Sequence, residues 1–174
     1  YIPVGWFAAD MSGDNSVSHA LEYYVADHAL AKMARERGDN TLADVLEQRA
    51  EGWRNYYSKE SGTMRPRMMD GSFITPCDPK DGANFSNTVG FHEGSAWNYT
   101  FFVPHSLGAL IRVMGGPKRF TERLWSIFEE GHYDPTNEPD IAYPYLFARI
   151  KGEEWRTQYL VKQLLNENYS TTPD

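Results

Sequence analysis

The stretch FHEGSAWNY, residues 91–99, places a single carboxylate among aromatic side chains. Glu93 stands between His92 and a glycine, and Trp97 and Tyr99 follow shortly after. Aromatic neighbours that desolvate a carboxyl group raise its pKa, and a proton donor at neutral pH needs such a raised pKa. We therefore predict that Glu93 is a general acid, with His92 tuning it or hydrogen-bonding a substrate. The simpler interpretation is a carboxylate in the first turn of a helix, where the helix dipole favours negative charge.

A second group of polar side chains occupies NEPD, residues 137–140. Asn137, Glu138 and Asp140 carry oxygen atoms of the kind that calcium prefers. Because a residue before proline avoids helical backbone angles, we expect Pro139 to hold Glu138 in an extended turn. The alternative is an ordinary helix start with Asp140 near the first turn. The spacing is not that of an EF-hand loop, so this segment alone does not establish a metal site.

The remaining motifs indicate no other catalytic chemistry. The histidines lack the spacing of zinc ligands, and Ser106 has no evident base. The GGP segment at 115–117 cannot cradle a phosphate, because Pro117 has no amide hydrogen. Cys77 is the one cysteine, so no internal disulfide can form, and without a paired thiol or nearby base we expect it to be inert.

Composition limits the class of protein. The chain has 174 residues and 41% hydrophobic content, which fits one domain or a large piece of one. A net charge of −7 argues against nucleic acid as a partner, since that affinity comes from Lys and Arg on phosphates. No apolar run approaches the length of a membrane span. The 14% aromatic content is explained mainly by a large core, and the functional alternative is a cleft that stacks on sugar rings.

Hydrophobic periodicity predicts helices and no strand of any length. The first helix is expected from an N-cap at Ser18 to Gly38, and the second from Thr41, with Asp44 completing a capping box. The connection is short, so the two should form an antiparallel hairpin. The expected buried stripe of the first helix is Leu21, Val25, Ala29 and Met33. The expected buried face of the second is Leu42, Val45, Leu46, Ala50, Trp53, Tyr56 and Tyr57.

Long and short connections alternate in the rest of the chain. Further helices are expected at 93–103, 105–114, 117–131, 141–150 and 153–168. The last should turn Trp155, Tyr159, Leu160 and Leu164 inward. The segment Lys59–His92 has no periodicity, and a loop this long in a compact domain is usually functional, so we expect it to pack over one end. Longer loops gathered at one end would bring Glu93 and NEPD to the same mouth.

Several of these segments together resemble a known family. VSHALEYYVADHALAKMA, GFHEGSAWNYTFFVPH, NEPDIAYPYLF and WRTQYLV are similar to glycoside hydrolase family 92, the calcium-dependent exo-acting α-mannosidases. The resemblance spans nearly all of the chain and keeps the order of the motifs. It implies an N-terminal β-sandwich joined to a C-terminal (α/α)6 barrel. Residues 1–174 would be a central part of that all-α barrel, with the sandwich and the C-terminal end of the barrel outside this chain.

The resemblance also implies roles for individual residues. Glu93 matches the catalytic acid of the family. Glu138 matches a glutamate of the mannose-binding cleft, and Asn137 lies at its side. His92 and Trp97 complete the expected substrate-binding set.

Calcium and a catalytic base are implied in the same way. Asn98 stands where relatives often have glutamine, and its amide oxygen is expected near the calcium together with the Glu138 carboxylate. Members of the family invert the anomeric centre with an aspartate base in a Gly-Asn-Asp/Glu-Asp segment, which is expected just beyond residue 174.

The implied function is an inverting exo-α-mannosidase, specific for α-1,2 linkages, that removes terminal mannose from glycans. The enzyme would be secreted, periplasmic or at the cell surface. One alternative is a carbohydrate-binding or scaffold module of the same fold without catalysis. Another is a trehalase-like or glucoamylase-like (α/α)6 hydrolase, against which NEPDIAYPYLF argues. A partial barrel exposes faces that its neighbours should cover, so the chain alone is expected to be marginally stable or to need the rest of the enzyme.

Overall fold

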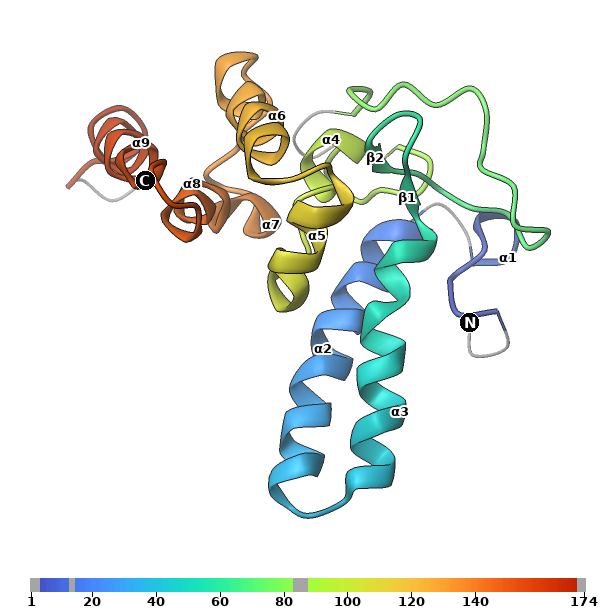
Figure 1. Cartoon of the computed structure of the whole chain (residues 1–174). Coiled ribbons are helices and arrows are strands. Elements are labelled where there is room, and N and C mark those ends of the chain that lie inside the picture. The colour runs from blue at the N-terminus through green and yellow to red at the C-terminus, as the bar shows by residue number, and fades with distance from the viewer. Residues whose placement is uncertain (1–3, 13–14, 83–87, 172–174) are drawn as a thin grey trace.

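The computed structural model describes residues 4–12, 15–82 and 88–171. The α-helices are α1 (Ala9–Ser12), α2 (Ser16–Glu36), α3 (Asn40–Ala50), α4 (Ala96–Tyr99), α5 (Leu107–Val113), α6 (Pro117–Glu129), α7 (Glu138–Ile141), α8 (Tyr143–Leu146) and α9 (Glu154–Glu167) (Figure 1). Short 3-10 helices are η1 (Glu51–Asn55), η2 (Pro104–Ser106) and η3 (Phe147–Arg149). Strands β1 (Tyr57–Ser58) and β2 (Thr63–Met64) form a small antiparallel hairpin with Tyr57 opposite Met64. The described chain is therefore mostly helical, as the periodicity predicts.

Helices α2 and α3 form the predicted antiparallel hairpin, which projects away from the rest of the chain (Figure 1). Gly38 has a φ of 82° and ends α2, because glycine takes this left-handed conformation without a steric penalty. Near the tip, the Arg35 guanidinium pairs with Asp44 at 2.9 Å and with Glu47 at 2.8 Å. These exposed pairs connect the two helices at the end opposite Glu93.

Both predicted helix starts in this hairpin were wrong. Helix α2 begins at Ser16, so Ser18 lies inside its first turn rather than at the cap. Helix α3 is capped by Asp39, whose carboxylate accepts a hydrogen bond from the Leu42 amide at 3.0 Å. Several adjacent side chains in the connection to α3 can cap a helix, and Asp39 is the one that does so.

The predicted buried faces were right in part: Leu21, Leu46, Ala50, Trp53 and Tyr56 are buried, whereas other expected positions are exposed. In α2 the buried positions are Ser16, Val17, Ser18, Ala20, Leu21, Tyr24, Asp27, Ala31 and Ala34. Met33 is 60% exposed, since a strict four-residue repeat drifts around a helix of 3.6 residues per turn. In α3, Leu42 and Val45 are exposed and Ala43, Leu46 and Ala50 are buried. The half of the hairpin near its tip thus presents apolar side chains that no described residue covers.

The hydrophobic core lies at the base of the hairpin, between α2, η1, α4, α6 and η3. Its largest fully buried side chains include Trp53, Tyr24, Tyr56, Tyr143 and Phe91. Phe101 packs edge-on against Phe120 at 5.5 Å and against Tyr143 at 5.9 Å between ring centroids. The high aromatic content is therefore used mainly in the core.

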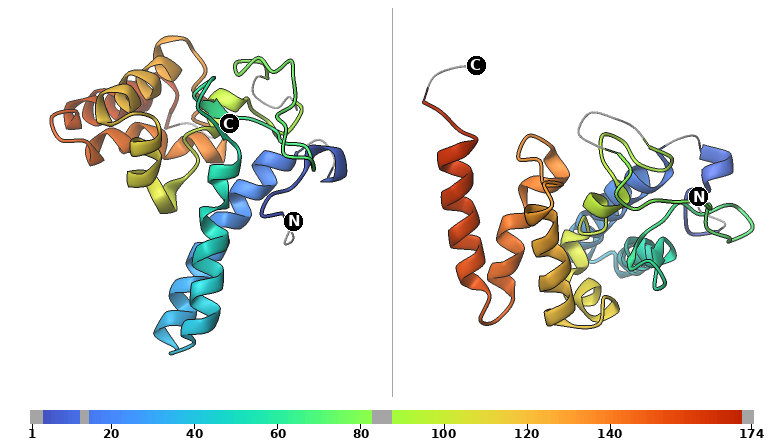
Figure 2. Two further views of the ribbon diagram at one scale, coloured as in Figure 1. Left: turned by 45° about the vertical axis from the view of Figure 1, so that its right-hand side comes forward. Right: turned by 90° about the horizontal axis from the view of Figure 1, so that it is seen from above.

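The second half of the chain contains shorter elements than predicted. The expected helix at 93–103 is the single turn of α4, and the expected helix at 141–150 is divided into α8 and η3. Helices α5, α6 and α9 occur close to the predicted ranges, and α6, α8 and α9 lie alongside one another (Figure 2, right). In α9 Leu160 is buried, whereas Trp155 and Tyr159 are about half exposed, contrary to the predicted face.

The described part of Lys59–His92 packs over the base of the hairpin, as predicted, while 83–87 lie outside the described residues. The Gly90 carbonyl accepts from the Val17 amide at 2.9 Å, at the start of α2. The Pro79 carbonyl accepts from the Trp97 amide at 2.7 Å, in α4. None of the described helices is long and apolar enough to cross a membrane.

Candidate active site

Glu93 has an unusual backbone. Its φ is 50°, and among the described residues it is the one non-glycine with a positive φ. A left-handed conformation costs a residue with a side chain roughly 1–2 kcal/mol, so surrounding contacts must hold it. Glu93 precedes α4, whose N-cap is Ser95, so the interpretation of Glu93 as a first-turn helix carboxylate was wrong.

Contacts from different parts of the chain fix the backbone around Glu93. The Asn137 side-chain amide donates to the Glu93 carbonyl at 2.5 Å. The His92 amide donates to the Ser18 hydroxyl of α2 at 3.0 Å, and the Tyr99 hydroxyl of α4 donates to the His92 carbonyl at 2.8 Å. The NEPD loop, α2 and α4 therefore meet at this one residue pair.

The Glu93 side chain is reachable from solvent. It is 39% exposed, and its Oε1 lies 3.5 Å from His92 Nε2. Phe91 and Tyr99, which were expected to desolvate the carboxylate, instead belong to the core and lie 5.7 Å apart between ring centroids.

Trp97 has cationic neighbours. The Lys80 ammonium lies 4.9 Å and the Arg123 guanidinium 4.8 Å from its ring centroid. These cation–π contacts occupy the indole with protein groups. The structure therefore places Trp97 beside α6 and the 78–80 loop, although the sequence groups it with Glu93.

Further carboxylates gather near Glu93. Partial burial raises the pKa of Glu22 in α2, and the Glu138 carboxylate raises it further. Burial likewise raises the pKa of the Tyr99 hydroxyl. The carboxylates that raise it further are those of Glu22, Asp140, Glu93 and Glu138. The two predicted acids thus share one locality, as the argument from loop lengths predicts.

Glu22 was missed in the sequence analysis. The sequence spacing could have indicated it. Glu22 follows Ser18 by four residues, so it lies on the face of α2 that contacts His92. Glu138 also differs from expectation, since it is the first residue of α7 rather than part of an extended turn. Pro139 is compatible with this, because proline is tolerated in the first turn of a helix.

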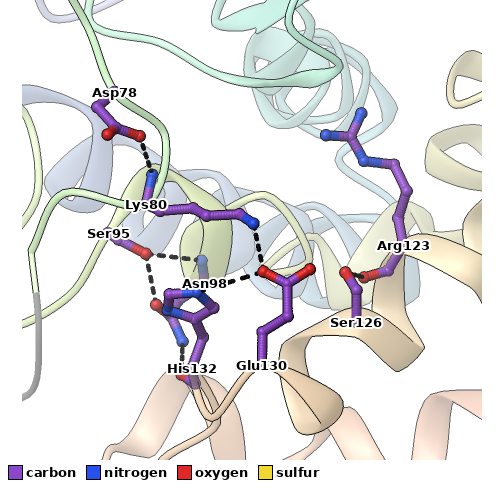
Figure 3. Close-up of polar contacts among 8 residues, drawn as sticks. All are labelled: Asp78, Lys80, Ser95, Asn98, Arg123, Ser126, Glu130 and His132. Atoms are coloured by element: carbon purple, nitrogen blue, oxygen red, sulfur yellow. Dashed lines mark hydrogen bonds and ion pairs between the residues drawn. The ribbon is translucent and has the colours of Figure 1, made fainter.

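Asn98 is buried, and its side-chain amide is bonded within the protein (Figure 3). Its Oδ1 accepts from the Ser95 hydroxyl at 2.6 Å. Its Nδ2 donates to the His132 carbonyl at 2.6 Å and to Asp140 Oδ2 at 2.8 Å. Asn98, predicted near calcium, therefore joins α4 to the loop and helix that carry Glu138.

Asp140, which the sequence offered as one of three oxygen ligands in NEPD or as part of a helix start, is the buried carboxyl of this network. It is 1% exposed, and burial raises its pKa to about 7. Hydrogen bonds from the Asp134 amide and from Asn98 oppose this shift, and the Asp134 carboxylate adds to it. Asp140 Oδ1 has no hydrogen-bond partner among the described residues.

A metal site is not completed by these residues alone. Within residues 4–12, 15–82 and 88–171, no group of three or more His, Cys, Asp or Glu side chains is placed to hold a metal ion. Glu138 offers one exposed carboxylate, whereas the Asn98 amide is committed to Ser95, His132 and Asp140. The described side chains therefore do not fit calcium without further ligands.

Comparison with known proteins decides the family. The Glycosyl hydrolase family 92 catalytic domain matches this chain over residues 1–174. The chain belongs to glycoside hydrolase family 92. The predicted membership is thus confirmed.

Solved members of family 92 have the same fold over this region. A family 92 α-mannosidase from Bacteroides thetaiotaomicron, in complex with mannoimidazole, superposes with a TM-score of 0.90 at 26% identity, covering 98% of this chain and 24% of that one. A family 92 inverting mannosidase from the same organism gives a TM-score of 0.86 at 25% identity, covering 97% and 25%.

A curated relative is an uncharacterized secreted glycosidase from Arthroderma benhamiae. It is 25% identical over 150 residues, covering 76% of this chain and 19% of its own length. This chain thus spans about a quarter of the two solved relatives and about a fifth of the curated one.

Proposed function

We propose that this chain is part of an inverting exo-α-mannosidase in which Glu93 is the general acid. The left-handed backbone of Glu93 carries the proposal. Backbone strain in folded proteins concentrates at functional sites, where surrounding structure must maintain it. Here Asn137, Ser18 and Tyr99 provide the contacts that do so. A carboxylate that served only to stabilise a helix would not require this arrangement.

The proposed chemistry needs two carboxyl groups. In an inverting glycosidase, a protonated carboxyl protonates the leaving oxygen while an ionised carboxylate activates water on the opposite face of the sugar. Glu93 would supply the proton. The base is proposed to be an aspartate in a Gly-Asn-Asp/Glu-Asp segment beyond residue 174, and a β-sandwich would close the cleft over this portion of an (α/α)6 barrel.

The substrate is proposed to be a glycan with a terminal α-mannose, in an α-1,2 linkage. Glu138 and Glu22 can accept hydrogen bonds from sugar hydroxyls beside Glu93, and His92 can donate or accept one. Asn137 holds the Glu93 backbone and lies at the same mouth. Because Lys80 and Arg123 cover its ring, Trp97 would support the wall of the site instead of stacking on the sugar. The enzyme would act outside the cytoplasm, in line with the secreted glycosidase of Arthroderma benhamiae that it resembles.

Calcium is proposed for the intact enzyme, with Glu138 as one ligand and the others from outside the described residues. Bound calcium would orient sugar hydroxyls. Exhaustive chelation should abolish most activity, and added calcium should restore it, as followed by release of mannose. Undiminished hydrolysis after chelation, with metal content verified by elemental analysis, would reject calcium.

The role of Glu93 is tested by Glu93→Gln in the intact enzyme. General acid catalysis contributes typically ~10²–10⁴-fold, so hydrolysis of mannosides with poor leaving groups should fall by about that factor. A dinitrophenyl mannoside needs little protonation and should lose far less. The measurement is kcat/KM on both substrates.

Glu36→Gln, at the far end of α2, is the matched control and should leave both rates unchanged. Equal losses on the two substrates, at unchanged thermal stability, would show that Glu93 is not the acid. A wild-type enzyme that binds mannosides without hydrolysing them would favour the alternative of a non-catalytic carbohydrate-binding module.

A further inference from the structure

A cavity lies between the β1–β2 turn and the connection from α5 to α6, apart from the candidate active site. Its volume is about 580 Å³. Lys59, Arg119 and Arg123 line it, together with the Tyr57 side chain. Glu60 and Glu122 line it as well, so the three cationic side chains exceed the carboxylates by one in a chain whose net charge is −7.

The two arginines of this cavity lack carboxylate partners. Among the described residues, neither Arg119 nor Arg123 forms an ion pair. Arg123 is half-buried, its Nη2 donates to the Ser61 carbonyl at 3.1 Å, and burial lowers its pKa. A partly desolvated guanidinium without a counter-ion is costly, so an anion in the cavity would stabilise it.

Tyr57 adds a neutral donor to the same cavity. It lines the cavity with Arg119 and Arg123. Partial burial raises the pKa of its hydroxyl, while the charges of Arg123 and Arg119 lower it. No hydrogen bond of this hydroxyl occurs within the described ranges. The cavity therefore places the Tyr57 hydroxyl beside two guanidinium groups that form no ion pair within the described ranges.

The Arg123 guanidinium lies against Gly62 in the β1–β2 turn. Gly62 has a φ of 69°, and a Cβ atom there would lie 1.7 Å from Arg123 Nη1. An L side chain at this positive φ would be strained, and its Cβ would displace the guanidinium from its place against the turn. The arginine is thus seated by the backbone as well as by its bond to Ser61.

We propose that this cavity binds an oxyanion, either free phosphate or sulfate or the same group carried as an ester on a carbohydrate. Guanidinium groups match the oxygen atoms of phosphate with paired donors, and a nearby phenol and ammonium add single ones. Glu60 and Glu122 also line the cavity, and these carboxylates can accept hydrogen bonds from sugar hydroxyls beside the anion. Binding here does not depend on hydrolysis at Glu93.

The test is calorimetric titration of the intact enzyme with inorganic phosphate and, separately, with a hexose phosphate. Arg119→Gln should weaken binding about tenfold or more, because it removes a charged donor to the anion. Tyr57→Phe removes a neutral donor and should weaken binding a few-fold. Lys118→Gln removes the same charge from the adjacent position of α6, which does not line this cavity, and should leave binding unchanged.

Each outcome decides the proposal. Tighter binding of the hexose phosphate would assign the ester, whereas equal or tighter binding of inorganic phosphate would assign the free ion. No binding of either ligand by the wild-type enzyme at millimolar concentration would overturn the proposal, as would equal weakening by Lys118→Gln and Arg119→Gln. Thermal unfolding of each variant confirms its fold, and Tyr57→Phe, which removes one hydroxyl, keeps the test valid if Arg119→Gln is unstable.

Discussion

Asp140 links α4 to the loop before α7 through one carboxylate oxygen. Its Oδ2 accepts from Asn98 Nδ2 at 2.8 Å and from the Asp134 amide at 3.1 Å. The Tyr143 hydroxyl, from α8, donates to the Asn98 carbonyl at 2.7 Å. Asn98 lies in α4, shortly after Glu93, and Asp140 lies in α7, which begins with Glu138. The Asp140 carboxyl therefore fixes the distance between α4 and α7.

Replacing Asp140 should therefore affect stability and acid catalysis together. In the intact enzyme, Asp140→Ala leaves two buried donors unpaired and should cost about 2 kcal/mol or more. Asp140→Asn keeps an acceptor oxygen and should lose less. The thermal midpoint of each variant measures the first effect, and kcat on mannosides with poor and activated leaving groups measures the second.

A positioning role predicts that Asp140→Ala loses more kcat on the poor leaving group, with KM nearly constant and partial rescue in Asp140→Asn. If both variants instead lowered stability while their kcat values matched wild type, Asp140 would be structural only.

At the scale of elements, the sequence predicted what local rules determine. The α2–α3 hairpin and the ends of α2 and α6 at Gly38 and Gly131 follow from periodicity and glycine conformation, and the structure has them. The single turn of α4 was not predictable in this way. The backbone before it is held by Asn137 and Ser18, which are 44 and 74 residues away from their partners in sequence. Contacts at that separation leave no trace in local periodicity.

In the candidate site, too, some features follow from local sequence and others from contacts between distant residues. Glu93 and Glu138 were identified from residue type and family motif, and their shared locality from loop lengths. The assignment of Glu138 to an extended turn was wrong because proline at the second helical position is compatible with a helix start. Glu22 and the structural role of Asn98 depend on which faces of α2, α4 and α7 meet, and that is decided by packing.

At the scale of the whole molecule, apolar side chains remain uncovered at both extremes. Leu30, Met33, Leu42 and Val45 are about half exposed or more near the hairpin tip, and Tyr145, Trp155, Tyr159 and Leu165 are so around α9. Contiguous apolar surface is rarely left bare in soluble proteins. Since the chain spans about a quarter of its solved relatives, we expect the remaining enzyme to cover these faces.

Residues 1–174 expressed alone should consequently be marginally stable or self-associate. Sedimentation and thermal unfolding of this fragment provide the measurement. Replacing Leu42 and Val45 with Gln should reduce self-association, because these side chains are exposed and form no part of the core. A monomer with cooperative unfolding and no response to the two substitutions would contradict the expectation.

The hydrogen bond from the His92 amide to the Ser18 hydroxyl couples the orientation of α2 to the backbone beside Glu93. The helix runs from Ser16 to Glu36, 21 residues, and at 1.5 Å per residue it is about 30 Å long. Its root carries the hydroxyl that holds the His92 amide, one residue from Glu93, while its tip lies at the opposite end. A small tilt of this arm about its root would turn Ser18 and Glu22 relative to the NEPD loop. We therefore expect a shift of the whole arm, imposed at its tip about 30 Å away, to change the alignment of Glu93.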